Sequence, residues 1–278
     1  MTERASGMST PDPIVFDQPH YDRLNTARAA VLRRLLAELE PKISLKSALD
    51  AGCGTGYFSA VLRDLGLRVA AFDGRPENTE EARRRHPGIE FRVGDVESIA
   101  TSEAGSFDLV LCLGLLYHLE NPFRAIRNLQ GMTGKLLVLE GICLPGDEAL
   151  LALRDENHGR DQGLNYVAFY PSEACLTKML YRAGFRAVYR LVPRPDHNEY
   201  RDSPLRNRSR TMLAAARESI AVSCLELLAE PATNPDPWET SWARFSWPAR
   251  RLYLFLTKPW ALKVAAVRRR LGLKQASS

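Results

Sequence analysis

The stretch from Leu49 to Tyr57 reads LDAGCGTGY and carries glycines at the alternate positions 52, 54 and 56. Ser47 to Asp50 reads as a short buried strand, and a helix is predicted from about Tyr57 to Leu65. Glycine lets the backbone pass close to a ligand and adopt dihedral angles closed to other residues. The start of the helix adds free N–H groups and the positive end of its dipole. A strand, a glycine turn and a helix in this order predict a nucleotide-type binding site.

The spacing of the glycines argues against two phosphate-binding motifs. A Rossmann dinucleotide site follows GxGxxG, which would put its third glycine at Tyr57. A P-loop needs Gly-Lys-Ser/Thr, whereas Gly56 is followed by Tyr57 and Phe58. The pattern in this chain is DxGxGxG, which fits neither motif.

Strand and helix patterns alternate around this turn. Further strands are predicted at 68–72, 89–93, 107–113 and 135–140, and helices at 22–39, 76–85 and 122–129. The apolar run FDLVLCL suits the centre of a parallel sheet. We therefore predict a Rossmann-like α/β fold, a doubly wound and mostly parallel sheet with a helical N-terminal segment and helices on both faces.

The rhythm breaks after Glu140. The segment from Gly141 to Asn165 reads as irregular, and residues 141–170 are predicted to form a substrate lid. Next come a helix with Ser172 and Gly184 as its caps, and strands at 185–192 and 211–215.

Acidic residues follow the second and third predicted strands. Asp73 lies about 20 residues beyond the first glycine, the separation expected of a carboxylate that accepts hydrogen bonds from ribose hydroxyls. Asp95 falls at the carboxyl end of its strand, where open α/β sheets bind ligands. Two readings without a ligand remain open, in which Asp73 caps helix 76–85 and Asp95 caps a loop.

In combination these motifs resemble the class I S-adenosylmethionine-dependent methyltransferases. The resemblance is carried by DAGCGTGY, Phe72-Asp73, Gly94-Asp95-Val96 and FDLV from Phe107, and it covers about Ser47 to Glu140. It implies S-adenosylmethionine as the cofactor and a sheet of the family's seven-stranded type. The cofactor site that it implies consists of Asp50, Gly52, Cys53, Gly54, Gly56, Asp73, Gly74, Asp95, Val96 and Leu113.

The resemblance also assigns roles within this site. Asp50 and the glycine backbone would hold the methionine portion, and the backbone around Leu113 would receive its ammonium group. Asp73 would bind the ribose. Asp95 would bind the adenine amino group, with Val96 beside the ring.

Candidate catalytic residues follow the fourth strand, in a loop that lies beside the transferred methyl group in the resembled family. His118 could accept the proton of an acceptor hydroxyl, because an imidazole titrates near neutral pH. Tyr117 could wall the methyl channel, and Glu140 could orient an acceptor. Each also has a structural reading: loop ordering for His118, packing for Tyr117 and a buried salt bridge for Glu140. No metal site is predicted.

Composition sets the remaining expectations. The net charge is +5, and the five cysteines are scattered without a zinc or disulfide spacing, which favours a reducing compartment. The N-terminus lacks the apolar core of a signal peptide, so a cytoplasmic location is predicted. We divide the chain into a lead-in (1–20), a methyltransferase domain (21–216) and an extension (217–278) that contains a basic amphipathic helix. This helix is predicted to pack on the domain or on a second copy in a homodimer, with peripheral membrane contact as the alternative.

The predicted function is methyl transfer to a small-molecule acceptor. The favoured acceptor group is a hydroxyl of a sugar, natural product or lipid-linked metabolite. Two alternatives stay open. The segments GLLYHLENP, FYPS and RTMLAA are similar to those of the bacterial tRNA wobble-uridine carboxymethyltransferases, although a nucleic-acid partner is the less favoured reading. A non-catalytic subunit that binds the cofactor is the other.

Overall fold

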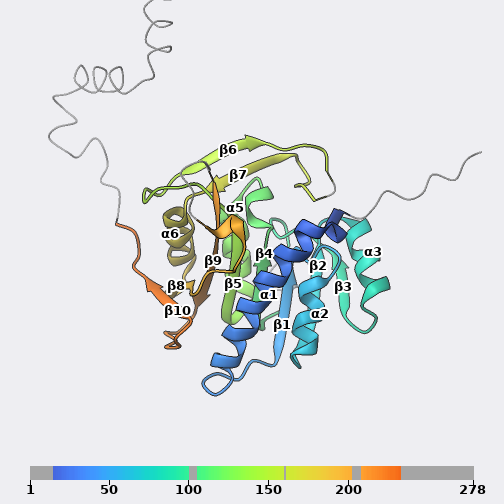
Figure 1. The fold of residues 1–278 in the computed structure, drawn as a ribbon, viewed down its shortest axis with the longest axis horizontal. Helices are drawn as coiled ribbons and strands as arrows, with labels where there is room; N and C mark the ends of the chain where they lie inside the picture. Colours follow the sequence, from blue (N-terminus) through green and yellow to red (C-terminus); the bar gives the residue numbers. More distant parts are fainter. Residues whose placement is uncertain (1–14, 100–104, 160, 202–207, 233–278) are drawn as a thin grey trace, which may run out of the picture. The chain divides into compact units, whose positions relative to one another are not determined.

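A computed structural model describes residues 15–99, 105–159, 161–201 and 208–232. The compact unit Met1–Pro231 contains every element below, and the other unit, Ala232–Ser278, lies outside the described residues except for Ala232. The centre of the first unit is an eight-stranded sheet in the order β10-β8-β9-β5-β4-β1-β2-β3 (Figure 1). Its strands are β1 (Ser47–Ala51), β2 (Arg68–Asp73), β3 (Glu90–Val93), β4 (Phe107–Leu113), β5 (Thr133–Cys143), β8 (Ala187–Leu191), β9 (Ser209–Ala216) and β10 (Leu225–Leu228).

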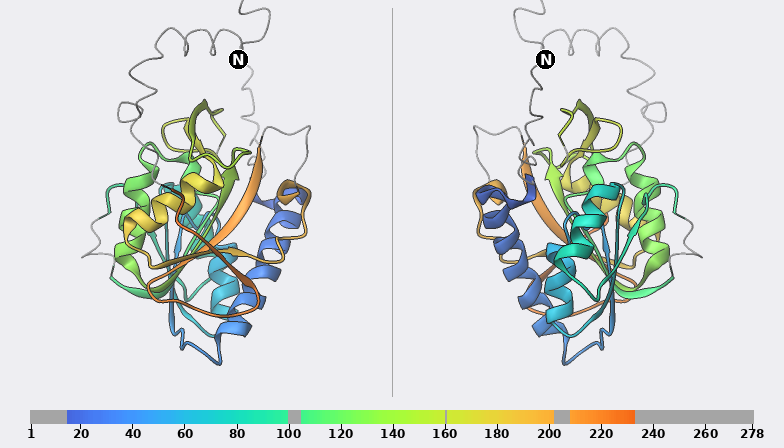
Figure 2. Two further views of the ribbon diagram at one scale, coloured as in Figure 1. Left: turned by 90° about the vertical axis from the view of Figure 1, so that its left-hand side faces the viewer. Right: turned by 90° about the vertical axis from the view of Figure 1, so that its right-hand side faces the viewer.

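Alternation of side chains along the strands explains how helices come to cover both faces of the sheet. In β4, Leu109 and Leu111 pack in a core with helices from one side, whereas Val110 and Cys112 pack in a second core on the other. Figure 2 shows the sheet between these two helical layers. The first layer contains α1 (Pro19–Leu39) and α2 (Tyr57–Asp64), the second α5 (Pro122–Met132) and α6 (Glu173–Ala183), and α3 (Pro76–Arg85) packs beside β2 and β3.

The predicted α/β fold is confirmed. Strands β1 to β5 pair in parallel, and β9 and β10 are antiparallel to their neighbours. The predicted caps of α6 are present: the Ser172 side chain accepts a hydrogen bond from Cys175 N, and Gly184 adopts a left-handed conformation.

Two features differ from the sequence expectations. The segment expected to be irregular contains β6 (Leu151–Asp155), which pairs antiparallel with β7 (Val167–Pro171). Leu151 and Leu153 are 43% and 58% exposed, so β6 lacks the buried face that makes a strand recognisable in a sequence. The sheet has eight strands rather than seven, because Leu225–Leu228 pairs with β8 although it follows the predicted domain boundary at residue 216.

The predicted basic helix of the extension falls in residues 233–278, outside the described part of the chain, as does most of the lead-in. Within the described ranges, no helix has both the length and the apolar character that crossing a membrane requires.

Candidate active site

The glycine turn after β1 is built by backbone conformation and by one carboxylate. Gly52 and Gly54 have φ angles of +76° and +52°, which side chains rarely adopt. A methyl group added to Gly52 would lie 2.8 Å from the Leu115 side chain, so only glycine fits there. The N–H of Gly54 donates a 2.9 Å hydrogen bond to Asp73 Oδ2, which ties the turn to the end of β2.

A cavity of about 700 Å³ opens above this turn, at the carboxyl ends of β1, β2 and β4. Its volume is in the range of small-molecule and cofactor sites. Most of the predicted cofactor residues line it, namely Gly52, Cys53, Gly54, Asp73, Gly74, Asp95, Val96 and Leu113. The structure therefore brings these residues together around one space.

Asp50 and Gly56, also predicted in this site, lie outside the lining of the cavity. Asp50 is buried and accepts a 2.7 Å hydrogen bond from Ser59 Oγ, so it supports the turn from below. Burial raises the pKa of the Asp50 carboxyl to about 6. Gly56 begins α2, and a side chain there would meet His86 and Phe91.

The two acidic residues at the strand ends have structural contacts as well as a place on the cavity wall. Asp73 Oδ1 accepts hydrogen bonds from Arg75 N at 2.9 Å and Asn78 Nδ2 at 3.0 Å. Asp95 Oδ1 accepts one from Glu97 N at 2.9 Å. The loop-capping role considered for Asp95 is therefore present. The helix-capping role considered for Asp73 is not, because the N-cap of α3 is Arg75 and has no side-chain cap hydrogen bond. Both carboxylates also line the cavity.

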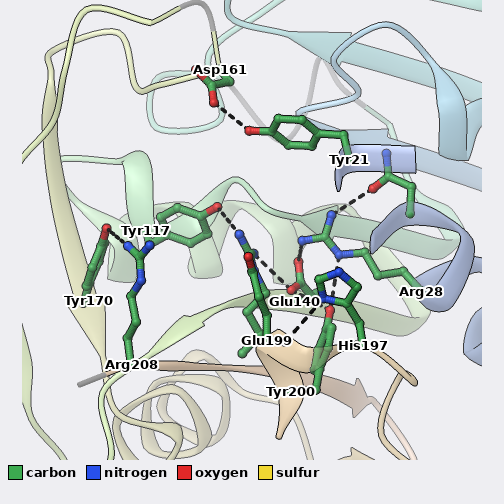
Figure 3. Close-up of polar contacts among 12 residues, drawn as sticks. Tyr21, Arg28, Tyr117, Glu140, Asp161, Tyr170, His197, Glu199, Tyr200 and Arg208 are labelled. Carbon is green, nitrogen blue, oxygen red and sulfur yellow. Dashed lines mark hydrogen bonds and ion pairs between the residues drawn. The ribbon is translucent and has the colours of Figure 1, made fainter. Parts of the chain in front are cut away.

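The loop between β6 and β7 (residues 156–166, all described except residue 160) borders the same cavity, and we call it the lid loop. Glu156 Oε1 lies 2.5 Å from His118 Nδ1, and its Oε2 accepts a hydrogen bond from Gly163 N at 2.9 Å. Tyr21 of α1 donates a 2.6 Å hydrogen bond to Asp161 Oδ2 (Figure 3). Arg75 Nη2 donates to the carbonyl oxygens of residues 162 and 163. The lid loop is thus fastened from three separate elements.

Of the candidate catalytic residues, His118 and Tyr117 line the cavity and Glu140 does not. Glu140 is fully buried within β5, which continues to Cys143 instead of ending at Glu140 as expected, and it forms ion pairs with Arg28 and Arg210. Burial alone would raise its pKa, but the two arginines outweigh burial and hold the pKa below its usual range. Its salt-bridge reading is therefore the one realised in the structure. Burial raises the pKa of the Tyr117 hydroxyl, which keeps its proton at neutral pH.

Sequence reasoning missed the cavity residues that come from distant elements. Arg28 lies in α1 and Arg210 in β9, and both line the cavity beside Tyr21 and Asp161. Arg28 is almost completely buried in a helix whose other buried residues are apolar. In the sequence, an arginine in an amphipathic helix is expected on the solvent-exposed face. Only the tertiary structure shows that Arg28 is buried.

Comparison with known proteins agrees with this geometry. Residues 49–135 match a family model described as a methyltransferase domain. A ubiquinone biosynthesis O-methyltransferase of Xanthomonas axonopodis pv. citri (strain 306) is 32% identical over 164 residues, which cover 56% of this chain and 68% of that protein. The chain belongs to the class I S-adenosylmethionine-dependent methyltransferases.

Other relatives of this methyltransferase are similar over shorter stretches or in fold alone. The corresponding enzyme of Xanthomonas campestris pv. campestris (strain B100) is 39% identical over 83 residues, which cover 28% of this chain and 35% of that protein. The N-terminal domain of EvdMO1 with SAH bound has a TM-score of 0.56 at 23% identity, over 68% of this chain and 80% of that one. Magnesium protoporphyrin IX methyltransferase from Synechocystis PCC 6803 with bound SAM has a TM-score of 0.50 at 20% identity, over 72% and 85% of the two chains.

Membership in the family establishes S-adenosylmethionine as the methyl donor of this methyltransferase. The residues present fit that molecule, because the cavity offers a side-chain-free glycine backbone, two carboxylates at strand ends and a buried arginine. The glycine backbone has room for the methionine portion of the cofactor. The two carboxylates can accept hydrogen bonds from its hydroxyl and amino groups, and the arginine can pair with its carboxylate.

Proposed function

We propose that this methyltransferase acts on a hydroxyl group of a small-molecule acceptor and that His118 takes up the hydroxyl proton. The observation that carries the proposal is the 2.5 Å contact between His118 Nδ1 and Glu156 Oε1 at the cavity wall. A carboxylate at Nδ1 fixes that nitrogen as a donor and leaves Nε2 as the acceptor. His118 then has the arrangement of a general base whose orientation is set by a second group.

The cofactor residues are assigned in the same proposal. Asp73 binds the ribose hydroxyls, and Asp95 binds the adenine amino group with Val96 beside the ring. Arg28 binds the carboxylate of the methionine end, because its guanidinium group lines the cavity close to Gly114, which follows β4. A methyl group added to Gly114 would lie 3.9 Å from Arg28 Nη2. When bound, the cofactor supplies a methyl group that is already activated by the sulfonium charge.

The bound cofactor would supply its methyl group to the acceptor oxygen and leave as S-adenosylhomocysteine, and His118 Nε2 would take up the hydroxyl proton. The protein contributes mainly alignment and exclusion of water. Tyr117 and the lid loop form part of the cavity wall, and Glu140 acts as a positioning residue through its two arginines.

Similarity to relatives supports an oxygen acceptor. The Xanthomonas protein that is 32% identical is named as an O-methyltransferase. The tRNA-modifying and non-catalytic alternatives gain no support from the family model or from these relatives.

Methyl transfer by the full-length protein tests the proposal. The protein is incubated with S-adenosylmethionine and panels of hydroxylated metabolites, and O-methyl products are identified by mass spectrometry. We expect His118→Gln to lower kcat about 10²- to 10⁴-fold, the range of general base catalysis, without loss of cofactor binding. The control is His158→Gln, because His158 is exposed in the same lid loop and stacks on Tyr166 outside the cavity lining. Unchanged kcat in His118→Gln would exclude His118 as the base.

A further inference from the structure

Two guanidinium groups meet at the end of the cavity beside Tyr117. Arg28 Nη2 lies 2.7 Å from Glu140 Oε2, an ion-pair contact whose angle is outside the range of a hydrogen bond. Arg210 Nη1 lies 3.2 Å from Glu140 Oε1. Figure 3 shows Glu140 pointing toward Arg28, with the Tyr200 hydroxyl donating to the same carboxylate. The fully buried Glu140 carboxylate is therefore shared as an ion-pair partner by two buried arginines.

The other partners of the two arginines are neutral or partly exposed, although the formal charges of Arg28, Arg210, Glu140 and Glu199 balance. Arg28 otherwise contacts neutral groups, the Asn25 side chain and the Tyr200 hydroxyl. Glu199, the second carboxylate partner of Arg210, has a side chain that is 41% exposed. Solvent weakens an ion pair with an exposed partner, so a ligand carboxylate would give Arg210 a stronger partner inside the cavity.

The two arginines contact different groups in the cavity. Arg28 lies beside Gly114, which follows β4, and the proposed contact with the methionine carboxylate accounts for it. Arg210 contacts the Tyr117 side chain. Its Nη2 is 3.4 Å from the Tyr117 hydroxyl, and its guanidinium carbon is 5.7 Å from the centroid of that ring. Tyr117 is a neutral and weak partner, so Arg210 keeps N–H groups for a ligand.

The anion site and the proposed base border the same aromatic ring. The Tyr117 and His118 ring centroids are 4.1 Å apart, and the Arg210 guanidinium carbon lies 5.7 Å from the Tyr117 centroid. His118 and Arg210 therefore both lie next to the Tyr117 ring, and an acceptor that reaches both must carry a hydroxyl and an anion on one small frame. A guanidinium group matches a carboxylate with two parallel hydrogen bonds.

We propose that the acceptor is a cyclic hydroxy acid whose carboxylate binds Arg210 while its hydroxyl faces His118. This inference rests on the proposed function, since it uses His118 as the base. The carboxylate takes no part in the bond changes. Arg210 is a specificity-determining residue: it selects charged acids over their neutral esters.

Binding to the full-length protein loaded with S-adenosylhomocysteine tests this without any turnover. The probes are 3- and 4-hydroxybenzoate and glucuronate, each compared with its own methyl ester by calorimetry. We expect at least one acid to bind about tenfold or more tightly than its ester. The aromatic and sugar arms distinguish the two sources of the ring. Equal binding of acids and esters, or no binding of any acid, would overturn the proposal.

A variant of the arginine separates this inference from the proposed function. Arg210→Gln should remove the acid preference and leave S-adenosylhomocysteine affinity within about threefold. Arg208→Gln is the matched control, because Arg208 is exposed, contacts Tyr170 and does not line the cavity. If Arg210→Gln weakens S-adenosylhomocysteine binding and spares the acid preference, Arg210 belongs to the cofactor site and the inference is wrong. If Arg210→Gln does not fold, the acid and ester comparison on the wild type decides. Methyl transfer to neutral alcohols, with no preference for acids, would leave the proposed function standing and exclude this inference.

Discussion

At the scale of single residues, Asp73 holds the glycine turn in place and also lines the cavity. Its Oδ2 accepts the Gly54 N–H, and its Oδ1 accepts Arg75 N and Asn78 Nδ2. Hydrogen bonds to a charged group contribute about 1.5–3 kcal/mol, so this carboxylate is a principal support of the glycine turn. Replacing it should therefore lower both the stability of the fold and the affinity for the cofactor.

We expect Asp73→Asn to weaken binding of S-adenosylhomocysteine at least tenfold and to lower Tm. In the wild type, backbone N–H groups donate to both oxygens of Asp73. The asparagine side chain has an NH2 group in place of one oxygen, so a donor would face a donor. Calorimetry and thermal denaturation measure the two effects. The control is Asp22→Asn, an exposed carboxylate on the rim of the same cavity. Unchanged affinity in Asp73→Asn would remove this residue from the cofactor site.

Asp50 is a second residue whose charge has a measurable effect. Burial raises its pKa from 3.8 to about 6, so the folded protein holds the Asp50 proton more tightly than the unfolded chain does. Ionised Asp50 therefore opposes folding. This penalty is absent below pH about 4, grows between pH about 4 and 6, and is about 3 kcal/mol above that range.

Asp50→Asn should accordingly raise the free energy of unfolding at pH 7.5 by up to about 3 kcal/mol and leave it nearly unchanged at pH 4. Urea denaturation at the two pH values measures this difference. Asp64→Asn, which changes an exposed carboxylate at the end of α2, should show no such pH dependence. An equal effect of Asp50→Asn at both pH values would contradict the assignment.

At the scale of elements, the lid loop depends on close contact with the loop that follows β4. A methyl group added to Gly163 would overlap the carbonyl oxygen of His118 and approach Glu156 Oε2. Neither a backbone oxygen nor a carboxylate that is bonded to His118 can move away easily. Gly163 is therefore required for the close contact between the lid loop and the loop that follows β4.

We expect Gly163→Ala to lower kcat/KM at least tenfold with little change in Tm, because the lid loop lies at the surface of the core. Steady-state methyl transfer measures the loss. Asn157→Ala is the control in the same loop, since Asn157 is exposed and its side chain accepts a hydrogen bond from Gly159 N. Full activity in Gly163→Ala would show that this close contact is not needed for catalysis.

At the scale of the whole molecule, the sheet extends past the point where the sequence pattern suggested that the domain ends. Beyond residue 216, Leu225–Leu228 pairs with β8, and the Tyr181 hydroxyl donates to the Leu228 carbonyl at 2.6 Å. Glu38 of α1 accepts hydrogen bonds from Ser223 and Cys224. These contacts join the edge of the sheet to both helical layers.

Two truncations should therefore behave differently. A chain that ends at Ala232 is expected to keep the Tm and the S-adenosylhomocysteine affinity of its cavity. A chain that ends at Ala216 should lose several degrees of Tm, because β8 becomes an unpaired edge and Glu38 loses its partners. Circular dichroism melting compares them with the full chain. Equal stability of the two truncations would place the boundary at residue 216 after all.

The sequence by itself determined the parallel core and predicted most of the residues that gather around the cavity. A glycine turn with Asp73 and Asp95 at regular strand intervals is local information, because each motif lies next to the strand that presents it. Only the tertiary structure revealed the cluster of charges at the proposed acceptor end. Arg28, Glu140 and Arg210 come from α1, β5 and β9, far apart in the chain, and charge pairing between buried groups leaves no periodic pattern. The β6–β7 ribbon was likewise decided by pairing, since its exposed strand has no buried face to produce a signal.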